Sequence, residues 1–270
     1  MQVVTIATIN EEANQLKMLV FAEPGCGKTH LVASAALDPL TAPVLFLEYR
    51  AQIASLRSNP DYIKAIDEGN LIIIRLEKYS DLTRIHAWLK AGRGTNPNLD
   101  GLMESLGHGP DVMPKTIVFD SLTELQRSEV MRIAGNVPGK FLAEIEPPQI
   151  QDWGTLLNKF TTLAHDFFTL PYHVVFTGLE TVDYGKGPVG EAPPIDGYRV
   201  ALQGQAKRQF PAYALTLMRL ELAPRGATYF NVGYTRANKT AVKEQTGMIP
   251  AKVPNPTIPM LVKMLLKGGD

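Results

Sequence analysis

Residues 22–30 read Ala-Glu-Pro-Gly-Cys-Gly-Lys-Thr-His, and this stretch decides the fold of the chain. A short apolar run precedes it at residues 17–21, and residues 31–37 follow it with the composition of a helix that opens at Lys28. This order of strand, glycine loop and helix is typical of a P-loop. The pattern usually opens with glycine, whereas this chain has Ala22 there. The alternative is a glycine turn before an ordinary helix, and the intact core and flanks of the motif argue against it.

The residue types of this loop suit the phosphates of a nucleotide. Gly25 and Gly27 lack a Cβ, so the backbone can turn its N–H groups onto an anion at the start of a helix. Lys28 would contact the β and γ phosphates, and the Thr29 hydroxyl would ligate Mg²⁺. The sequence therefore predicts ATP and Mg²⁺ as cofactors, with a nucleotide site made of Glu23, Pro24, Gly25, Cys26, Gly27, Lys28, Thr29 and His30.

A second signal lies at residues 115–120, where an apolar, β-branched run ends in Asp120. A carboxylate at the tip of a strand beside a P-loop would hold Mg²⁺, as in a Walker B strand. Taken alone, Asp120 could equally be the N-cap of the following helix. Another buried strand is expected at residues 173–177, and Thr177 and Glu180 at its end lie where P-loop enzymes place a γ-phosphate sensor. The alternative for either residue alone is plain termination of the strand.

Composition narrows the class of protein. The 270 residues are 45% hydrophobic, which is ample for a buried core, and we expect one domain. The 27 basic and 27 acidic residues balance, so any nucleic acid must bind at a local patch. The single cysteine, Cys26, excludes an internal disulfide and fits a reducing cytoplasm. The longest apolar runs, such as residues 71–74, are too short to span a membrane.

Strands and helices alternate along the chain, which predicts an α/β fold with a mostly parallel sheet flanked by helices. Helices are expected from Ser80 or Asp81 to about residue 90, over 122–134, and over 150–170 with one apolar core face. An edge strand is expected at 3–6. The Gly- and Pro-rich stretches 92–114, 136–149 and 181–202 are expected to be surface loops. A hairpin of residues 212–222 and 228–234 precedes a basic tail at 236–270, which a helix over 258–266 closes.

Five stretches, taken in order, resemble phage nucleotide-binding proteins with a RecA-like AAA ATPase core. They are Gly25-Cys-Gly-Lys-Thr29, residues 116–125, Gln151-Asp-Trp-Gly154, His173-Val-Val-Phe-Thr177 and Gln203-Gly-Gln-Ala-Lys-Arg208. Within that group the chain is similar to Sak-type recombinases, which act in single-strand annealing. The resemblance implies one strand between the Walker A and Walker B strands, and homo-oligomeric rings or filaments with ATP bound between subunits.

The resemblance also assigns residues. Lys28 and Thr29 match the Walker A pair, Asp120 the Walker B acid and Thr177 the sensor. The glutamate that activates water in RecA-like proteins is replaced by Arg50. Glu48 is the first candidate to take its place, and the remaining candidates are Glu124 and Glu180. Basic residues that reach the γ-phosphate of a neighbouring subunit match Arg236 and Lys239, with Lys207 and Arg208 as a second possibility.

The function implied is an ATPase that acts on single-stranded DNA in recombination, annealing or repair. The DNA-facing loops would be 136–149 and 181–202, with bases stacked on Tyr184 or Tyr198 and phosphates on Lys207 and Arg208. An alternative is an ATP-gated module with little turnover that recruits replication or recombination partners, a single-strand-binding protein among the candidates. A small-molecule kinase fits less well, because no arginine-rich lid is evident.

Overall fold

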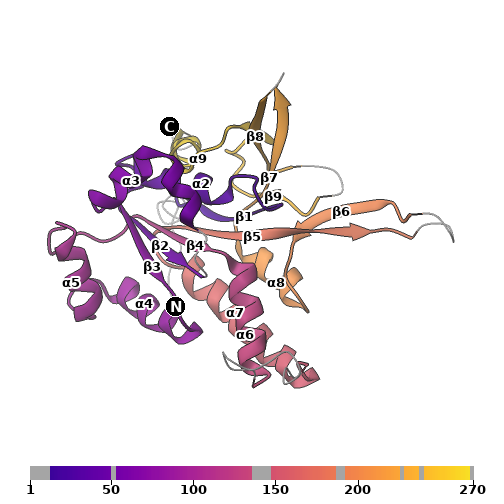
Figure 1. Cartoon of the computed structure of the whole chain (residues 1–270), viewed down its shortest axis with the longest axis horizontal. Helices are drawn as coiled ribbons and strands as arrows, with labels where there is room; N and C mark the ends of the chain where they lie inside the picture. The colour runs from indigo at the N-terminus through magenta and orange to yellow at the C-terminus, as the bar shows by residue number, and fades with distance from the viewer. Residues whose placement is uncertain are drawn as a thin grey trace.

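The central feature of the computed structural model is one large sheet with helices on both faces (Figure 1). The structure describes residues 13–49, 53–135, 147–186, 192–225, 228–236 and 240–267. The strands are β1 (Lys17–Ala22), β2 (Val44–Glu48), β3 (Leu71–Arg75), β4 (Thr116–Asp120), β5 (His173–Tyr184), β6 (Ile195–Val200), β7 (Thr216–Arg225), β8 (Thr228–Tyr234), β9 (Lys243–Glu244) and β10 (Lys252–Pro254). The helices are α2 (Lys28–Ala33), α3 (Pro60–Asp67), α4 (Tyr79–Ala91), α5 (Pro97–Ser105), α6 (Leu122–Ile133), α7 (Ile150–Phe168), α8 (Ala206–Tyr213) and α9 (Ile258–Leu266), with 3₁₀ turns η1 (Ser34–Leu37) and η2 (Ile53–Ser58).

The strand order is β10-β8-β7-β1-β5-β4-β2-β3, with β6 paired to β5 and β9 to β7. From β7 to β3 every neighbouring pair is parallel, and β8 and β10 join antiparallel at the other end. Strand β5 lies between β1, which carries the glycine loop, and β4, which ends in Asp120. This confirms the α/β fold with a mostly parallel sheet, one strand between β1 and β4, and a C-terminal hairpin.

The sheet separates two apolar cores, because successive side chains of a strand point to opposite faces. In β1, Leu19 and Phe21 join the core beneath α4, α6, α7 and α8. Met18 and Val20 join the core beneath α2, α3 and α9. Within the first core the rings of Phe119 and Phe176 stack with their centroids 4.1 Å apart. Both faces of the central strands are therefore buried, which explains their uninterrupted apolar runs.

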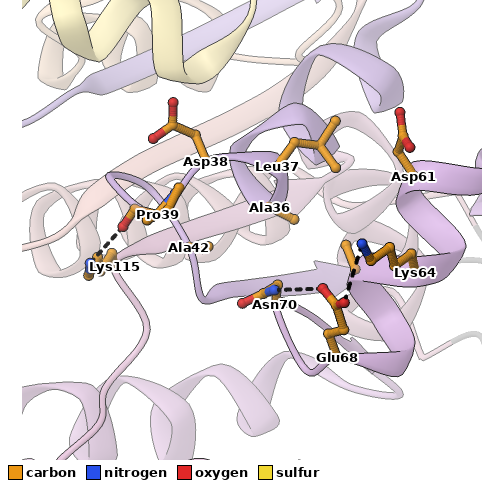
Figure 2. Close-up of a pocket in the computed structure, with 11 residues that line it drawn as sticks. Ala36, Leu37, Asp38, Pro39, Ala42, Asp61, Lys64, Glu68, Asn70 and Lys115 are labelled. Atoms are coloured by element: carbon orange, nitrogen blue, oxygen red, sulfur yellow. Dashed lines mark hydrogen bonds and ion pairs between the residues drawn. The ribbon is translucent and has the colours of Figure 1, made fainter.

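Parallel strands place all their amino ends at one edge of the sheet. A pocket of about 540 Å³ lies at this edge, lined by residues that immediately precede β2, β3 and β4 (Figure 2). Its charged side chains are Asp38, Asp61, Lys64, Glu68 and Lys115. The carboxyl ends of the same strands, where P-loop chemistry is expected, lie at the opposite edge.

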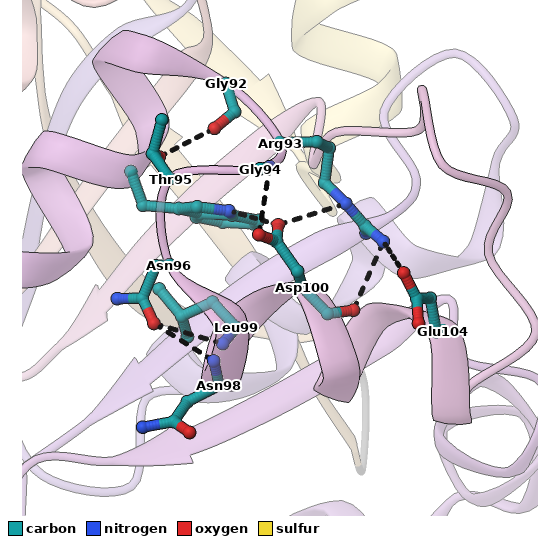
Figure 3. Close-up of polar contacts among 10 residues, drawn as sticks. Gly92, Arg93, Gly94, Thr95, Asn96, Asn98, Leu99, Asp100 and Glu104 are labelled. Carbon is teal, nitrogen blue, oxygen red and sulfur yellow. Dashed lines mark hydrogen bonds and ion pairs between the residues drawn. The ribbon is translucent and has the colours of Figure 1, made fainter.

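The prediction of a loop at 92–114 was wrong, because α5 occupies part of it. Asn96 caps this helix by accepting hydrogen bonds from the N–H groups of Asn98 and Leu99 (Figure 3). Asp100 ties the helix to α4 by accepting from the Trp88 indole at 2.9 Å and pairing with Arg93 at 3.1 Å. The Trp88 hydrogen bond is the main cause of a lowered pKa at Asp100. The Gly and Asn residues around α5 give this stretch the composition of a loop, so the sequence signals for the helix were missed.

The prediction of a loop over 181–202 was also wrong at both of its ends. Strand β5 continues to Tyr184 and pairs antiparallel with β6, from Glu180 opposite Val200 to Tyr184 opposite Ile195. This hairpin extends away from the body of the protein (Figure 1). An ion pair between Arg199 and Asp183 links its two strands. Residues 187–191 lie outside the described chain.

Of the remaining predictions, some are confirmed and some are wrong. The helices at 122–134 and 150–170 and the closing helix are confirmed as α6, α7 and α9. Helix α4 begins two or three residues earlier than predicted, because its N-cap is Lys78 rather than Ser80 or Asp81. Turn η2 and helix α3 were not predicted. The predicted strand at 3–6 and most of the 136–149 loop lie outside the described residues. Within the described ranges, no helix combines the length and apolarity needed to cross a membrane.

We predict that the protein loses stability in mild acid through His173, at the start of β5. Its Nδ1 accepts a hydrogen bond from the Leu16 N–H at 3.0 Å, and burial, with Lys17 and Lys115 nearby, lowers its pKa to about 4. The unfolded chain takes up this proton near pH 6.5, so stability falls between pH 6.5 and 4, by at most about 3 kcal/mol. Urea unfolding across this range should show that decline, and His173→Asn, which keeps an acceptor, should flatten it. An unaltered decline in the variant would contradict the assignment.

Candidate nucleotide-binding site

The glycine loop lies between β1 and α2 and turns through two residues with positive φ. Gly25 has φ 82° and Gly27 has φ 80°, a left-handed conformation that favours glycine. A Cβ on Gly27 would lie 2.7 Å from the Nδ2 atom of Asn231 on β8, whereas Gly25 faces open space. Asn231 therefore packs against the loop from the C-terminal hairpin, a contact that the sequence did not predict. These features form a cradle in which backbone N–H groups can meet an anion.

Lys28 lies at the start of α2 with its ammonium group directed back to the loop. Its Nζ donates to the carbonyl oxygens of Ala22 and Glu23 at 3.0 and 2.8 Å. Burial lowers the pKa of Lys28, while Cys26, Asp120 and Glu180 act to raise it. Because Ala22 contributes its carbonyl as the last residue of β1, the loop does not depend on glycine at that position. Burial raises the pKa of the Cys26 thiol.

Asp120, at the end of β4, is the centre of the site. Thr29 Oγ1 donates to its Oδ2 at 2.8 Å, and Thr177 Oγ1 donates to its Oδ1 at 2.5 Å. Burial raises the pKa of Asp120, and the two hydroxyls and Lys28 oppose this. The N-cap of α6 is Ser121, whose Oγ accepts from the Glu124 N–H. Asp120 is thus left to face the loop. A hydroxyl and a carboxylate are hard oxygen donors, which fit Mg²⁺.

Glu48 lies beside this group at the end of the neighbouring strand β2. It is opposite Asp120 in the strand register and fully buried. Its Oε1 accepts from the Ile53 N–H at 3.1 Å, and its Oε2 pairs with Arg75 Nε at 3.0 Å. The like charge of Glu48 adds slightly to the raised pKa of Asp120. The ion pair with Arg75 holds Glu48 in one orientation near Asp120.

The alternative carboxylates are also paired with arginines. Glu124 Oε1 lies 3.2 Å from Arg127 Nη1 on the same helix. Glu180 forms a two-point pair with Arg219 of β7, at 2.7 and 3.2 Å. Arg219 was not predicted as a site residue. Its guanidinium also lies 3.8 Å from the ring centroid of Tyr198.

The comparison with known proteins identifies the family of the chain. A family profile described as an AAA domain matches residues 14–246. The chain belongs to this AAA domain family. It is a P-loop ATPase of the AAA class, and nucleotide binding and hydrolysis belong to that class. A search of the curated proteins found no match. Among solved structures, a KaiC-like protein from the hyperthermophilic archaeon Pyrococcus horikoshii matches with 12% identity and a TM-score of 0.45, over 88% of this chain and 83% of that chain.

The remaining predicted residues of the AAA domain are dispersed. His30 lies at the base of the loop helix, with its ring 5.5 Å from that of Tyr62. Tyr184 is 64% exposed at the end of β5. Arg236 is exposed just beyond β8, while Lys239 and Arg50 lie outside the described residues. Lys207 and Arg208 lie on α8. The structure thus brings Lys28, Thr29, Asp120, Thr177 and Glu48 together and places the predicted DNA residues elsewhere.

Proposed function

We propose that the protein is a Mg²⁺-dependent ATPase that acts on single-stranded DNA in recombination, annealing or repair. The observation that carries the ATPase part is the Asp120 carboxylate, which accepts hydrogen bonds from the P-loop Thr29 and the β5 Thr177. Three separate segments of the chain thereby converge on one buried acid. A structural acid at a strand end would not need the hydroxyl of a P-loop.

Each residue has a role in this proposal. Lys28 neutralises phosphate charge, and the N–H groups around Gly25 and Gly27 orient the phosphates. Thr29 and Asp120 hold the metal ion, which supplies charge stabilisation at the transferring phosphoryl group when bound. Thr177 links β5 to Asp120 and so couples the sensor strand to the metal ligands. Glu48 orients the attacking water.

The finer parts of the proposal rest on the resemblance of the sequence motifs. These parts are phage origin, a cytoplasmic location, and assembly into rings or filaments. In such an assembly Arg236 and Lys239 would approach the γ-phosphate of a neighbouring subunit. Tyr184, Tyr198, Lys207 and Arg208 are the proposed contacts to DNA. The Arg219 guanidinium lies over the ring of Tyr198, whereas Tyr184 is exposed. Of the two tyrosines, Tyr184 is therefore favoured as the residue on which a base stacks.

A second candidate function is an ATP-gated module that recruits replication or recombination partners with little turnover. The observation in its favour is that Glu48, Glu124 and Glu180 each form an ion pair with an arginine. In each pair the guanidinium occupies at least one carboxylate oxygen, which is then less free to orient a water. ATP binding without rapid hydrolysis would follow.

Steady-state ATPase assays with and without single-stranded DNA separate the two functions. We expect measurable turnover that DNA accelerates, and a loss of about 10- to 100-fold in ATP affinity for Lys28→Ala, because a charged hydrogen-bond donor to phosphate is removed. Lys64→Ala, which removes an exposed lysine at the opposite edge of the sheet, is the matched control. ATP binding without turnover would support the recruitment module. Unchanged ATP affinity in Lys28→Ala would contradict both.

A further inference from the structure

Two cavities adjoin on the α6, α7 and α8 side of the sheet, and Trp153 of α7 lines both. Their volumes are about 560 and 460 Å³, each within the usual range for small-molecule sites. They share Trp153, Gly204 and Lys207. The larger cavity is also lined by residues of α6 and β6. The smaller cavity is also lined by residues of α7 and by Arg208 near the start of α8. Two stretches quoted above for their resemblance, 151–154 and 203–208, therefore meet here.

The charged residues that line these two cavities are all basic. Their ionisable lining residues are Arg127, Arg199, Lys207 and Arg208, and no Asp or Glu is among the lining residues that the structure describes. The pocket at the opposite sheet edge has similar volume but carries three acids beside two lysines (Figure 2). A polyanion is thus favoured at the Trp153 cavities and disfavoured at the other pocket.

Trp153 lines both cavities. The side chain is partly exposed, and a Cβ on Gly204 would lie 3.4 Å from its Cε3 atom. Gly204 has φ 61°, so a residue without a side chain lies beside the ring. An aromatic face beside cationic groups is the arrangement on which unpaired bases stack, since every base offers a π-face.

The cationic groups are partly fixed in place. Arg199 pairs with Asp183, and its buried Nε has no hydrogen-bond partner among the described residues. The Gln126 side chain accepts from the Gln203 N–H at 2.6 Å and donates to the Gln203 carbonyl at 3.4 Å. This holds the segment before α8 against α6. Arg199 and the segment before α8 are thereby positioned before any ligand arrives, which lowers the cost of binding.

We propose that these cavities bind single-stranded nucleic acid, with unpaired bases stacked on Trp153 and backbone phosphates held by Lys207, Arg208 and Arg199. The proposal rests on the proposed function and gives its DNA a specific site. It moves the stacking residue from Tyr184 and Tyr198 of the β5–β6 hairpin to Trp153 of α7. Helix α6, which walls the larger cavity with Thr123, Gln126 and Arg127, begins two residues after Asp120. The Thr123 hydroxyl also accepts from the Leu179 N–H on β5, so the cavity borders the strand whose Thr177 bonds to Asp120.

Trp153 itself provides the test. The chain has two tryptophans, and Trp88 is 1% exposed, so quenching of tryptophan emission by oligo(dT) reports on Trp153. We expect quenching in the wild type with ATP and Mg²⁺ present. In anisotropy titrations of labelled oligo(dT), Trp153→Leu should weaken binding about tenfold to a hundredfold. Lys207→Gln, a surface change that leaves the indole in place, should also weaken binding and lower the salt slope by about 0.7.

Controls separate the possible outcomes. Lys64→Gln removes the same charge at the acidic pocket and should bind like the wild type. Circular dichroism and ATP affinity establish that each variant is folded. Wild-type affinity and salt slope in both Trp153→Leu and Lys207→Gln would overturn this site while leaving DNA binding intact. Absence of any oligo(dT) binding by the wild type would overturn the site together with the DNA part of the proposed function.

Discussion

Replacing Asp120 with asparagine should reduce ATP turnover by at least about a hundredfold while preserving most of the ATP affinity. The amide has the shape of the carboxylate but no charge, so it cannot neutralise the metal ion. One of its two heteroatoms is also a donor, which disturbs the pair of hydroxyl bonds from Thr29 and Thr177. Steady-state hydrolysis and titration with a fluorescent ATP analogue measure the two effects separately.

Asp38→Asn is the matched control for this experiment. Asp38 lines the pocket at the opposite edge of the sheet and pairs with Lys263 at 2.6 Å. It carries the same charge change without contact to the P-loop, so its turnover should equal that of the wild type. Equal turnover in Asp120→Asn and Asp38→Asn would refute the assignment of Asp120 as a metal ligand.

The parts of the fold that could be predicted from the sequence are those whose signal is local. Buried parallel strands such as Val44–Glu48 and Thr116–Asp120 need apolar residues on both faces, and this produces runs that are visible without a structure. Helix α5 was missed because its cap, Asn96-Pro97, lies in a stretch whose composition is typical of loops. The β5–β6 hairpin was missed because its glycines and prolines gather around the connection, while its paired ends alternate only weakly.

The residues of the candidate site also divide into those with a local sequence signal and those without one. Lys28, Thr29 and Asp120 could be predicted because a P-loop and a Walker B strand have fixed local patterns. Asn231 and Arg219 could not, because their contacts depend on the pairing of β7 with β1 and β8. Arg219 had one signal, because it and Glu221 are charges inside a mostly apolar run at 216–223. A partly buried cation in a strand needs partners, and Glu180 and Glu221 are those partners.

The arginine pairs bear on catalysis as well as on structure. The ion pair with Arg75 and the bond from the Ile53 N–H fix the orientation of the Glu48 side chain, and a general base must be held within hydrogen-bond reach of the water. Glu48 combines this with its place opposite Asp120 in the register of β2 and β4. Glu124 is on α6 rather than at a strand end, and Glu180 is held at two points by Arg219. Position therefore favours Glu48.

Glu48→Gln should lower kcat about 10²- to 10⁴-fold with little change in ATP affinity, because a general base acts in the transition state. Glutamine keeps an acceptor for the Ile53 N–H and removes the charge. Single-turnover hydrolysis measures the chemical step directly. Glu124→Gln and Glu180→Gln are the parallel variants, and a larger loss in either one would transfer the role to that residue.

Arg75→Gln distinguishes a catalytic Glu48 from one that merely anchors β3. Arg75 is largely exposed, and its Nε pairs with Glu48 Oε2 at 3.0 Å. If Glu48 served only to hold this arginine, both variants would lose the same activity, since each breaks the same pair. If Glu48 orients the water, Arg75→Gln should retain most of the wild-type kcat, because the carboxylate remains and the Ile53 N–H still positions it. Equal losses in the two variants would therefore place the base elsewhere.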